Sequence, residues 1–231
     1  RPLWPGSDPQ TAGSWYDLAA DLGGELDRRG VTGAIGIGHS LGSVLSLLAA
    51  AENPDRYRAL ALVDPVVFAG FHALTWGAFK GLGLGNRLPL IQGASRRRDT
   101  FSDLEEVRRS WRGKPVFKSW DPRVLEDYIG SGFCADDSGM VTLRYPKAWE
   151  VKIFELTPAW VWRDLEGLRL PVLFVRGADS DTFLPSAVAR ARRRVQDVMV
   201  VEVEGTSHFL PMERPTDVAD IILDWADTTG I

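Results

Sequence analysis

The chain has 231 residues and a formal net charge of −4, with 45% apolar and 25% charged residues, the balance of an ordinary globular protein. That charge gives no overall basic field to attract nucleic acid, and the apolar runs fall far short of the ~20 residues of a membrane span. The one cysteine, Cys134, excludes an internal disulfide and a multi-cysteine zinc site. We therefore expect a soluble cytoplasmic protein, monomeric or homodimeric.

The predicted elements alternate between strands and helices. Residues 1–13 are rich in proline and glycine and should form a loop. Ser14 and Asp17 then have the spacing of a capping box, ahead of apolar residues at helical spacing. Short apolar runs indicate four buried parallel strands, at residues 32–38, 59–63, 172–175 and 198–203. With helices between them and a last helix from Pro215, the pattern predicts an α/β fold, a mostly parallel sheet with helices on both faces.

Residues 68–164 interrupt this alternation. The segment is mostly helical in pattern, with one short alternating run at 141–145. We interpret it as a helical cap or lid inserted into an α/β core made of residues 1–67 and 165–231. Most of the tryptophans that it contains should pack the cap onto the sheet, and some should line an apolar pocket above the active site. The six are Trp76, Trp111, Trp120, Trp149, Trp160 and Trp162.

The strongest chemical motif is Gly-His-Ser-Leu-Gly at residues 38–42. It follows a predicted strand and opens a predicted helix, where a sharp turn would strain the serine backbone and lift its hydroxyl above the sheet. The same turn would aim the N–H of Leu41 and the positive end of the helix at a substrate carbonyl oxygen. We therefore predict Ser40 as a nucleophile and Leu41 as an oxyanion donor.

A serine hydroxyl needs a neighbouring base at neutral pH. Of the three histidines, His39 should point away from the serine because it is adjacent in sequence, and His72 lies at the start of the inserted segment. His208 follows the last strand, in a loop that should meet Ser40 at the carboxyl edge of the sheet. His208 is thus the predicted base. Three scattered histidines and one cysteine leave no metal site and no implied cofactor.

Three stretches resemble the α/β-hydrolase superfamily, in particular its capped, esterase-like members. They are the Gly-His-Ser-Leu-Gly turn, the Asn-Pro-Asp-Arg-Tyr sequence at 53–57, and the tail Gly-x-x-His-x-x-Pro-Met-Glu-Arg-Pro that ends at Pro215. The match covers residues 14–67 and 168–228, and the inserted segment only loosely. It implies the chain order serine, acid, histidine, with a cap between the sixth and seventh strands.

The resemblance leaves the acid of the triad open among three aspartates. Members of the family usually carry the acid after the strand that corresponds to residues 172–175. Ser180 occupies the position where the acid most often stands, and Asp179 and Asp181 flank it. Asp181 is preferred because of its spacing from the next helix. Asp64, at the end of the strand at 59–63, is an alternative that some family members use. Any of these carboxylates could orient the imidazole if it reaches the far ring nitrogen.

These residues predict hydrolysis of a carboxylic ester or a related acyl bond through an acyl-enzyme, and the aromatic insertion implies a small hydrophobic substrate. Alternatives with the same residues are a lactonase, a thioesterase or a carbon–carbon bond hydrolase. A non-catalytic ligand-binding member of the fold is a further alternative.

The last expectation concerns the N-terminal edge of the sheet. Family members place several strands before the helix that precedes the serine turn, and a loop among them carries the second oxyanion donor. We expect a longer protein, by roughly 40–60 residues, and a strand at 32–38 that is unpaired on one side or paired with something outside this chain.

Overall fold

The computed structural model describes residues 7–83 and 88–231. They form two compact units. The larger comprises Gly13–Leu82 and Thr157–Ile231, and the smaller comprises the described residues of Arg1–Ala12 and Gly83–Leu156. None of the helices within the described ranges is long and apolar enough to cross a membrane.

The larger unit is built on four parallel strands at the four predicted places. These are β1 (Ala34–His39), β2 (Tyr57–Val63), β6 (Val172–Gly177) and β7 (Val198–Val203), in the spatial order β1-β2-β6-β7. The predicted α/β fold is therefore confirmed. Within the described residues β1 pairs only with β2, which is the edge position expected for it. The additional residues expected before the chain stay a prediction.

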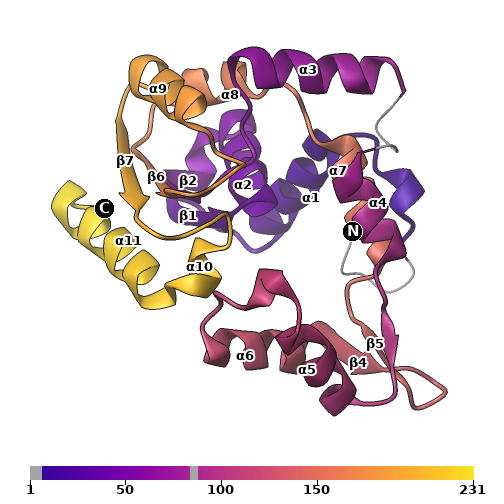
Figure 1. Ribbon diagram of the computed structural model, residues 1–231. Helices are drawn as coiled ribbons and strands as arrows, with labels where there is room; N and C mark the ends of the chain where they lie inside the picture. The colour runs from indigo at the N-terminus through magenta and orange to yellow at the C-terminus, as the bar shows by residue number, and fades with distance from the viewer. Residues whose placement is uncertain (1–6, 84–87) are drawn as a thin grey trace. The chain divides into compact units, whose positions relative to one another are not determined.

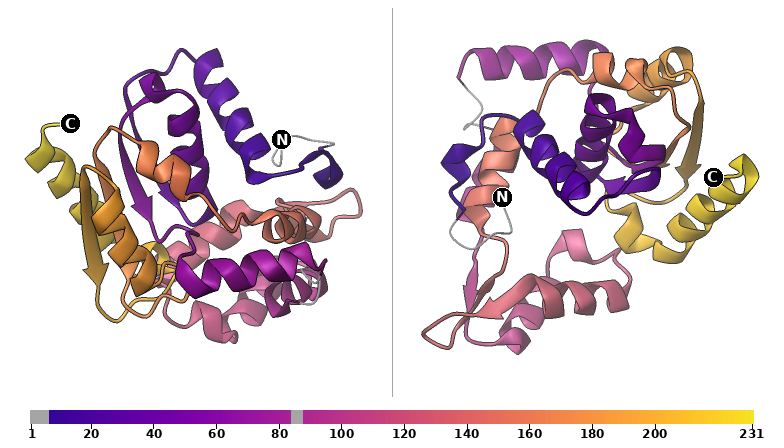
Figure 2. Two further views of the ribbon diagram at one scale, coloured as in Figure 1. Left: turned by 90° about the horizontal axis from the view of Figure 1, so that it is seen from above. Right: turned by 180° about the vertical axis from the view of Figure 1, so that it is seen from behind.

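Helices cover both faces of this sheet. On one face, Val218, Ile222 and Trp225 of α11 (Pro215–Thr229) are buried against alternate residues of β2 and β6. Since strand side chains alternate between faces, the intervening residues point to the opposite side, where α2 (Leu41–Glu52) packs on β1 and β2. Figures 1 and 2 show α11 and α2 on opposite sides of the strands.

The remaining elements of the larger unit connect these layers. Helices α1 (Trp15–Arg28) and α8 (Trp162–Gly167) pack against α2. Turn η2 (Pro54–Arg56) leads into β2, α9 (Pro185–Arg194) joins β6 to β7, and α10 (Leu210–Glu213) precedes α11.

The predicted capping box is present at the start of α1. Ser14 Oγ accepts the backbone N–H of Asp17 at 3.3 Å, and the Asp17 carboxylate accepts the Ser14 N–H at 3.0 Å. Of the loop expected over residues 1–13, residues 1–6 lie outside the described residues. The part that is described contains one short helical turn, η1 (Pro9–Thr11).

The smaller unit differs in content from the helical cap that the sequence suggests. It contains α4 (Pro89–Arg96), α5 (Leu104–Arg112), η4 (Pro115–Phe117), α6 (Pro122–Gly132) and α7 (Lys147–Leu156). It also contains an antiparallel sheet in the order β3 (Thr100–Phe101), β5 (Val141–Leu143), β4 (Phe133–Ala135). Cross-strand pairing therefore contributes to this unit beside helix packing.

Its boundaries are also narrower than the expected 68–164. Helix α3 (Gly70–Gly81) and α8 belong to the larger unit. Two indole groups account for this: Trp162 Nε1 donates to the Phe68 carbonyl at 2.6 Å, and Trp76 Nε1 donates to the Thr157 carbonyl at 3.0 Å. These bonds hold the two ends of the insertion together beside the parallel sheet.

Four of the six tryptophans are buried within their own units. Trp111, Trp120 and Trp149 are buried in the smaller unit and Trp162 in the larger, whereas Trp160 is 50% exposed. In the smaller unit the Trp111 ring stacks on Phe117, with centroids 4.7 Å apart. For most of these indoles, packing inside one unit is the role that the structure supports.

The first prediction concerns the core under α11. Trp225→Ala should lower the free energy of unfolding by about 3–5 kcal/mol, because it removes a buried indole and leaves a cavity. Leu223→Ala in the same helix is the matched control, because the Leu223 side chain is 62% exposed whereas that of Trp225 is 3% exposed. The control should change the free energy of unfolding by no more than about 0.5 kcal/mol. Urea unfolding measures both, and equal effects would contradict the packing described.

Candidate active site

Ser40 occupies a strained turn between β1 and α2. Its backbone has φ 53° and ψ −117°, a left-handed conformation that is costly for a residue with a Cβ. The Ser40 N–H donates to the Val63 carbonyl at 3.0 Å, which ties the turn to the end of the neighbouring strand. The turn therefore has the geometry expected from the sequence motif.

The two glycines of the motif differ in what they allow. A Cβ on Gly38 would collide with the backbone of Gly42 and Ser43, whereas a Cβ on Gly42 would meet nothing within 4 Å. Close approach of neighbouring backbone therefore requires a glycine at position 38 but not at position 42.

Leu41 is the first residue of α2. The first N–H groups of a helix have no acceptor within the helix, and the helix dipole makes this end partially positive. The Leu41 N–H is thus suited to donate a hydrogen bond to an anionic oxygen next to Ser40.

His208 lies between a hydroxyl and a carboxylate. Its Nε2 is 3.0 Å from Ser40 Oγ, and its Nδ1 is 2.9 Å from Asp64 Oδ1. Ser40 follows β1, Asp64 follows β2 and His208 follows β7, so three loops at the carboxyl edge of the sheet supply the group. Ser40 and His208 therefore lie in contact, as expected from their places in the sequence.

The acid preferred from the sequence, Asp181, is not the one beside His208. Asp181 is exposed, and its Oδ1 accepts from Thr182 Oγ1 at 3.2 Å, while Asp179 is also exposed. Asp64 instead reaches the imidazole, because β2 ends next to β1 in the sheet and a φ of 39° turns Asp64 at that end. The family spacing after β6 was a misleading guide here, since the neighbour of His208 depends on strand order.

Asp64 is completely buried and well provided with donors. Gly177 N–H donates to Oδ2 at 3.0 Å, and the Ser180 hydroxyl donates to Oδ1 at 2.6 Å. Burying a carboxylate is costly unless such donors replace water. Ser180 stands where the family spacing would place the acid, so the loop after β6 contributes a donor to the acid instead of the acid itself.

His39 lies against His208, a contact that the expectation of a side chain pointing away from the serine did not include. The two rings are 4.8 Å apart, and His39 Nε2 is 2.8 Å from the His208 carbonyl oxygen. Burial lowers the pKa of His39 to about 4, although the bond to the carbonyl favours the charged form. A neutral His39 must carry its proton on Nε2 to donate this bond. His72 is exposed on α3.

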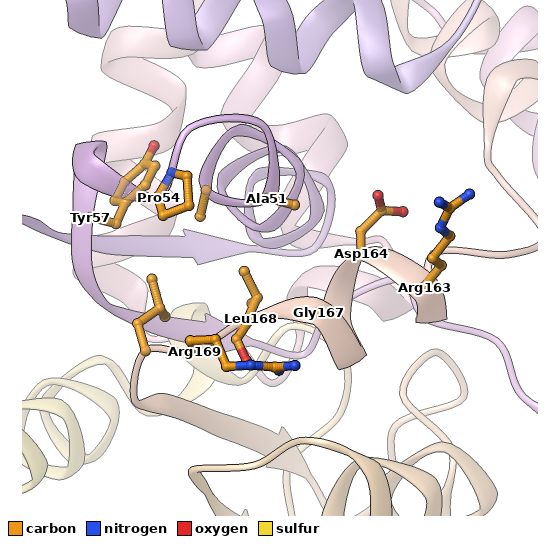
Figure 3. Close-up of a pocket in the computed structure, with 10 residues that line it drawn as sticks. Ala51, Pro54, Tyr57, Arg163, Asp164, Gly167, Leu168 and Arg169 are labelled. Carbon is orange, nitrogen blue, oxygen red and sulfur yellow. The ribbon is translucent and has the colours of Figure 1, made fainter.

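A cavity of about 400 Å³ in the larger unit lies away from these residues (Figure 3). It is lined by the end of α2, the start of β2 and the segment that precedes β6. Ser40 and Asp64 adjoin the other ends of these elements, at the start of α2 and the end of β2. The apolar pocket expected above Ser40 stays a prediction.

The second prediction follows from the partly buried His39. The lowered pKa of His39 means that between about pH 6.5 and pH 4 the unfolded chain binds a proton that the folded chain does not. The free energy of unfolding should therefore fall as the pH falls through this range, by at most about 1.4 kcal/mol per pH unit. His39→Gln keeps an N–H donor but cannot titrate, so its decline should be smaller. Urea unfolding at a series of pH values measures both proteins. If the free energy of unfolding falls equally with pH in the unaltered protein and in His39→Gln, His39 is not the group responsible.

Comparisons with known proteins agree with this architecture. The chain is 27% identical to 2-(acetamidomethylene)succinate hydrolase of Mesorhizobium japonicum, over 95% of this chain and 73% of that protein. The crystal structure of E-2-(acetamidomethylene)succinate hydrolase has a TM-score of 0.79 at 24% identity, covering 96% of this chain and 76% of that one. An esterase of M. tuberculosis has a TM-score of 0.67 at 21% identity, covering 93% and 69%. These two structural likenesses concern the fold.

The family comparison covers nearly the whole chain. The model of the alpha/beta hydrolase family matches residues 1–221. The parallel sheet, with the serine turn between β1 and α2, agrees with that match. The chain therefore belongs to the alpha/beta hydrolase family.

Proposed function

We propose that this protein is a serine hydrolase that cleaves a carboxylic ester, or a related acyl bond, of a hydrophobic small molecule through an acyl-enzyme. The observation that carries the proposal is the unbroken sequence of contacts from Ser40 Oγ through His208 to Asp64. It joins a hydroxyl, an imidazole and a buried carboxylate in the order that activates a serine.

The first half of the reaction transfers the acyl group to the enzyme. Asp64 Oδ1 accepts a hydrogen bond from His208 Nδ1–H, which keeps that proton on Nδ1 and leaves Nε2 as the acceptor for the Ser40 hydroxyl proton. Ser40 Oγ bonds to the substrate carbonyl carbon while that proton moves to Nε2. The carbonyl oxygen gains the negative charge and lies near the N–H of Leu41.

The second half releases the acyl group. Collapse of the tetrahedral intermediate breaks the bond to the alcohol, which leaves with the proton from Nε2, and Ser40 remains acylated. A water molecule then gives a proton to Nε2 and attacks the acyl carbon. The bond between the acyl carbon and Ser40 Oγ then breaks, the acid product leaves, and the proton on Nε2 returns to Ser40 Oγ.

Other members of this reaction class would use the same three residues. A lactone or thioester presents the same carbonyl to Ser40, and carbon–carbon bond hydrolysis would need a substrate that stabilises a carbanion. The names of the relatives include both a 2-(acetamidomethylene)succinate hydrolase and an esterase, so substrate class is the part of the proposal that needs direct measurement.

A non-catalytic binding protein is the alternative from another class. Ligand binding alone does not require a serine in a strained backbone conformation, because the strain costs on the order of 1–3 kcal/mol. It also does not require that serine to lie within hydrogen-bonding distance of an imidazole that is itself held by a buried carboxylate. These features favour turnover.

The third prediction tests the nucleophile. Ser40 should be labelled by a fluorophosphonate probe, and Ser40→Ala should abolish both labelling and hydrolysis of p-nitrophenyl esters, because the reacting oxygen is gone. Peptide mass spectrometry locates the label, and a series of acyl-chain lengths tests the hydrophobic preference. Ser186→Ala, on an exposed part of α9, is the matched control and should behave as the unaltered protein. Labelling at a different serine, or turnover by Ser40→Ala, would refute the assignment.

The fourth prediction separates the two aspartates. Asp64→Asn should lower kcat on the order of 10³–10⁴-fold, since the amide no longer favours the tautomer that activates Ser40. Asp181→Asn, at an exposed position, should leave kcat within about twofold of the unaltered enzyme. Steady-state kinetics on the best ester of the series measures both. The reverse ranking would restore Asp181 as the acid.

A further inference from the structure

The Ser180 hydroxyl has only one direction left for its hydrogen. Ser180 is buried in the loop between β6 and α9, and its Oγ accepts the N–H of Thr182 at 3.1 Å and of Phe183 at 3.4 Å. A hydroxyl has two lone pairs and one hydrogen. With both lone pairs occupied, the hydrogen points to the third neighbour, Asp64 Oδ1, at 2.6 Å.

That hydrogen bond acts on the oxygen that faces the base. Asp64 Oδ1 lies 2.6 Å from Ser180 Oγ and 2.9 Å from His208 Nδ1, whereas Oδ2 is bonded to Gly177 N–H. The Asp64 backbone is held by its own N–H, which donates to the Val175 carbonyl at 2.7 Å. Gly177 and Ser180 thus hold one carboxylate oxygen each, so the plane of the carboxylate is set independently of the imidazole.

We infer that Ser180 is a positioning residue for the proposed reaction: its hydroxyl holds Asp64 Oδ1 toward His208 Nδ1. The inference rests on the proposed function and assigns one residue of the loop after β6, Ser180, a part in it. Loss of this donor would leave a buried carboxylate oxygen with His208 as its remaining partner, and the carboxylate could then rotate about its bond to Cβ. The imidazole would spend less time in the orientation that accepts the Ser40 proton.

The effect should fall on kcat. Ser180 is buried and acts through Asp64, so its removal should leave substrate binding, and hence KM, close to that of the unaltered enzyme. Removing a hydrogen bond to a carboxylate should lower kcat by about 10–100-fold. A purely structural role would instead lower the amount of folded enzyme without changing the state of the His208 ring.

The experiment is a graded series at position 180 with a control in the same loop. Ser180→Ala removes the donor, and Ser180→Cys replaces it with a weak one. Thr182→Val removes a hydroxyl that bonds only Asp181 among the contacts described and leaves the backbone N–H on Ser180. kcat should decrease in the order unaltered, Cys, Ala, with Thr182→Val unchanged. If Ser180→Ala does not fold, the Cys variant carries the same test with a smaller effect.

A spectroscopic measurement separates this inference from the proposed function. In the resting protein, the proton on His208 Nδ1 should give a downfield ¹H NMR resonance that is absent from His208→Gln. Ser180→Ala should shift or broaden that resonance, and Thr182→Val should not. An unaltered protein that hydrolyses no ester but shows this response would refute the function and retain the positioning role. An active enzyme whose kcat and resonance are the same in Ser180→Ala would refute the positioning role alone.

Discussion

The buried carboxylate of Asp64 is the group on which the arrangement of the site depends. Its side chain has no exposure to solvent, so every contact that water would make must come from the protein. The donors come from three different segments: the end of β6 through Gly177, the following loop through Ser180, and the loop after β7 through His208. One residue thereby joins the carboxyl ends of β2, β6 and β7. The same requirement explains why the loop after β6 stays close to the site although its own aspartates are exposed.

Backbone strain in this structure is concentrated at the same edge of the sheet. Among the described residues other than glycine, Ser40 and Asp64 are the two with positive φ, and they follow neighbouring strands whose ends are paired, His39 with Val63. Each strained residue is held by a backbone hydrogen bond to the next strand, Ser40 to Val63 and Asp64 to Val175. Such conformations persist only where the surroundings hold them in place. The parallel sheet, whose central strands β2 and β6 are largely buried, provides that support and so keeps the hydroxyl and the carboxylate in place on either side of His208.

His39 makes two contacts with His208, one to its backbone carbonyl oxygen and one to its ring. His39 bonds the His208 carbonyl oxygen, and its ring lies tilted beside the His208 ring, so the residue that precedes the serine in the chain also holds the loop that carries the base. Because burial keeps the pKa of His39 low, this donor remains neutral where the proposed reaction would operate. It adds no competing positive charge to the imidazolium that would form on His208 during proton transfer.

Features that depend on local pattern could be predicted from the amino-acid sequence alone. Apolar runs located the four strands, Ser14 and Asp17 located the start of α1, and a glycine-flanked serine at a strand–helix junction located the strained turn, because these are set by neighbours in the chain. His208 followed from its place in a loop after the last strand. The identity of its carboxylate partner, the roles of Ser180 and His39, and the limits of the smaller unit were decided only by the tertiary structure. Asp64 and His208 are 144 residues apart, and their contact depends on strand order and on a local φ. Neither leaves a periodic signal in the sequence, because both arise from packing between segments that are distant along the chain.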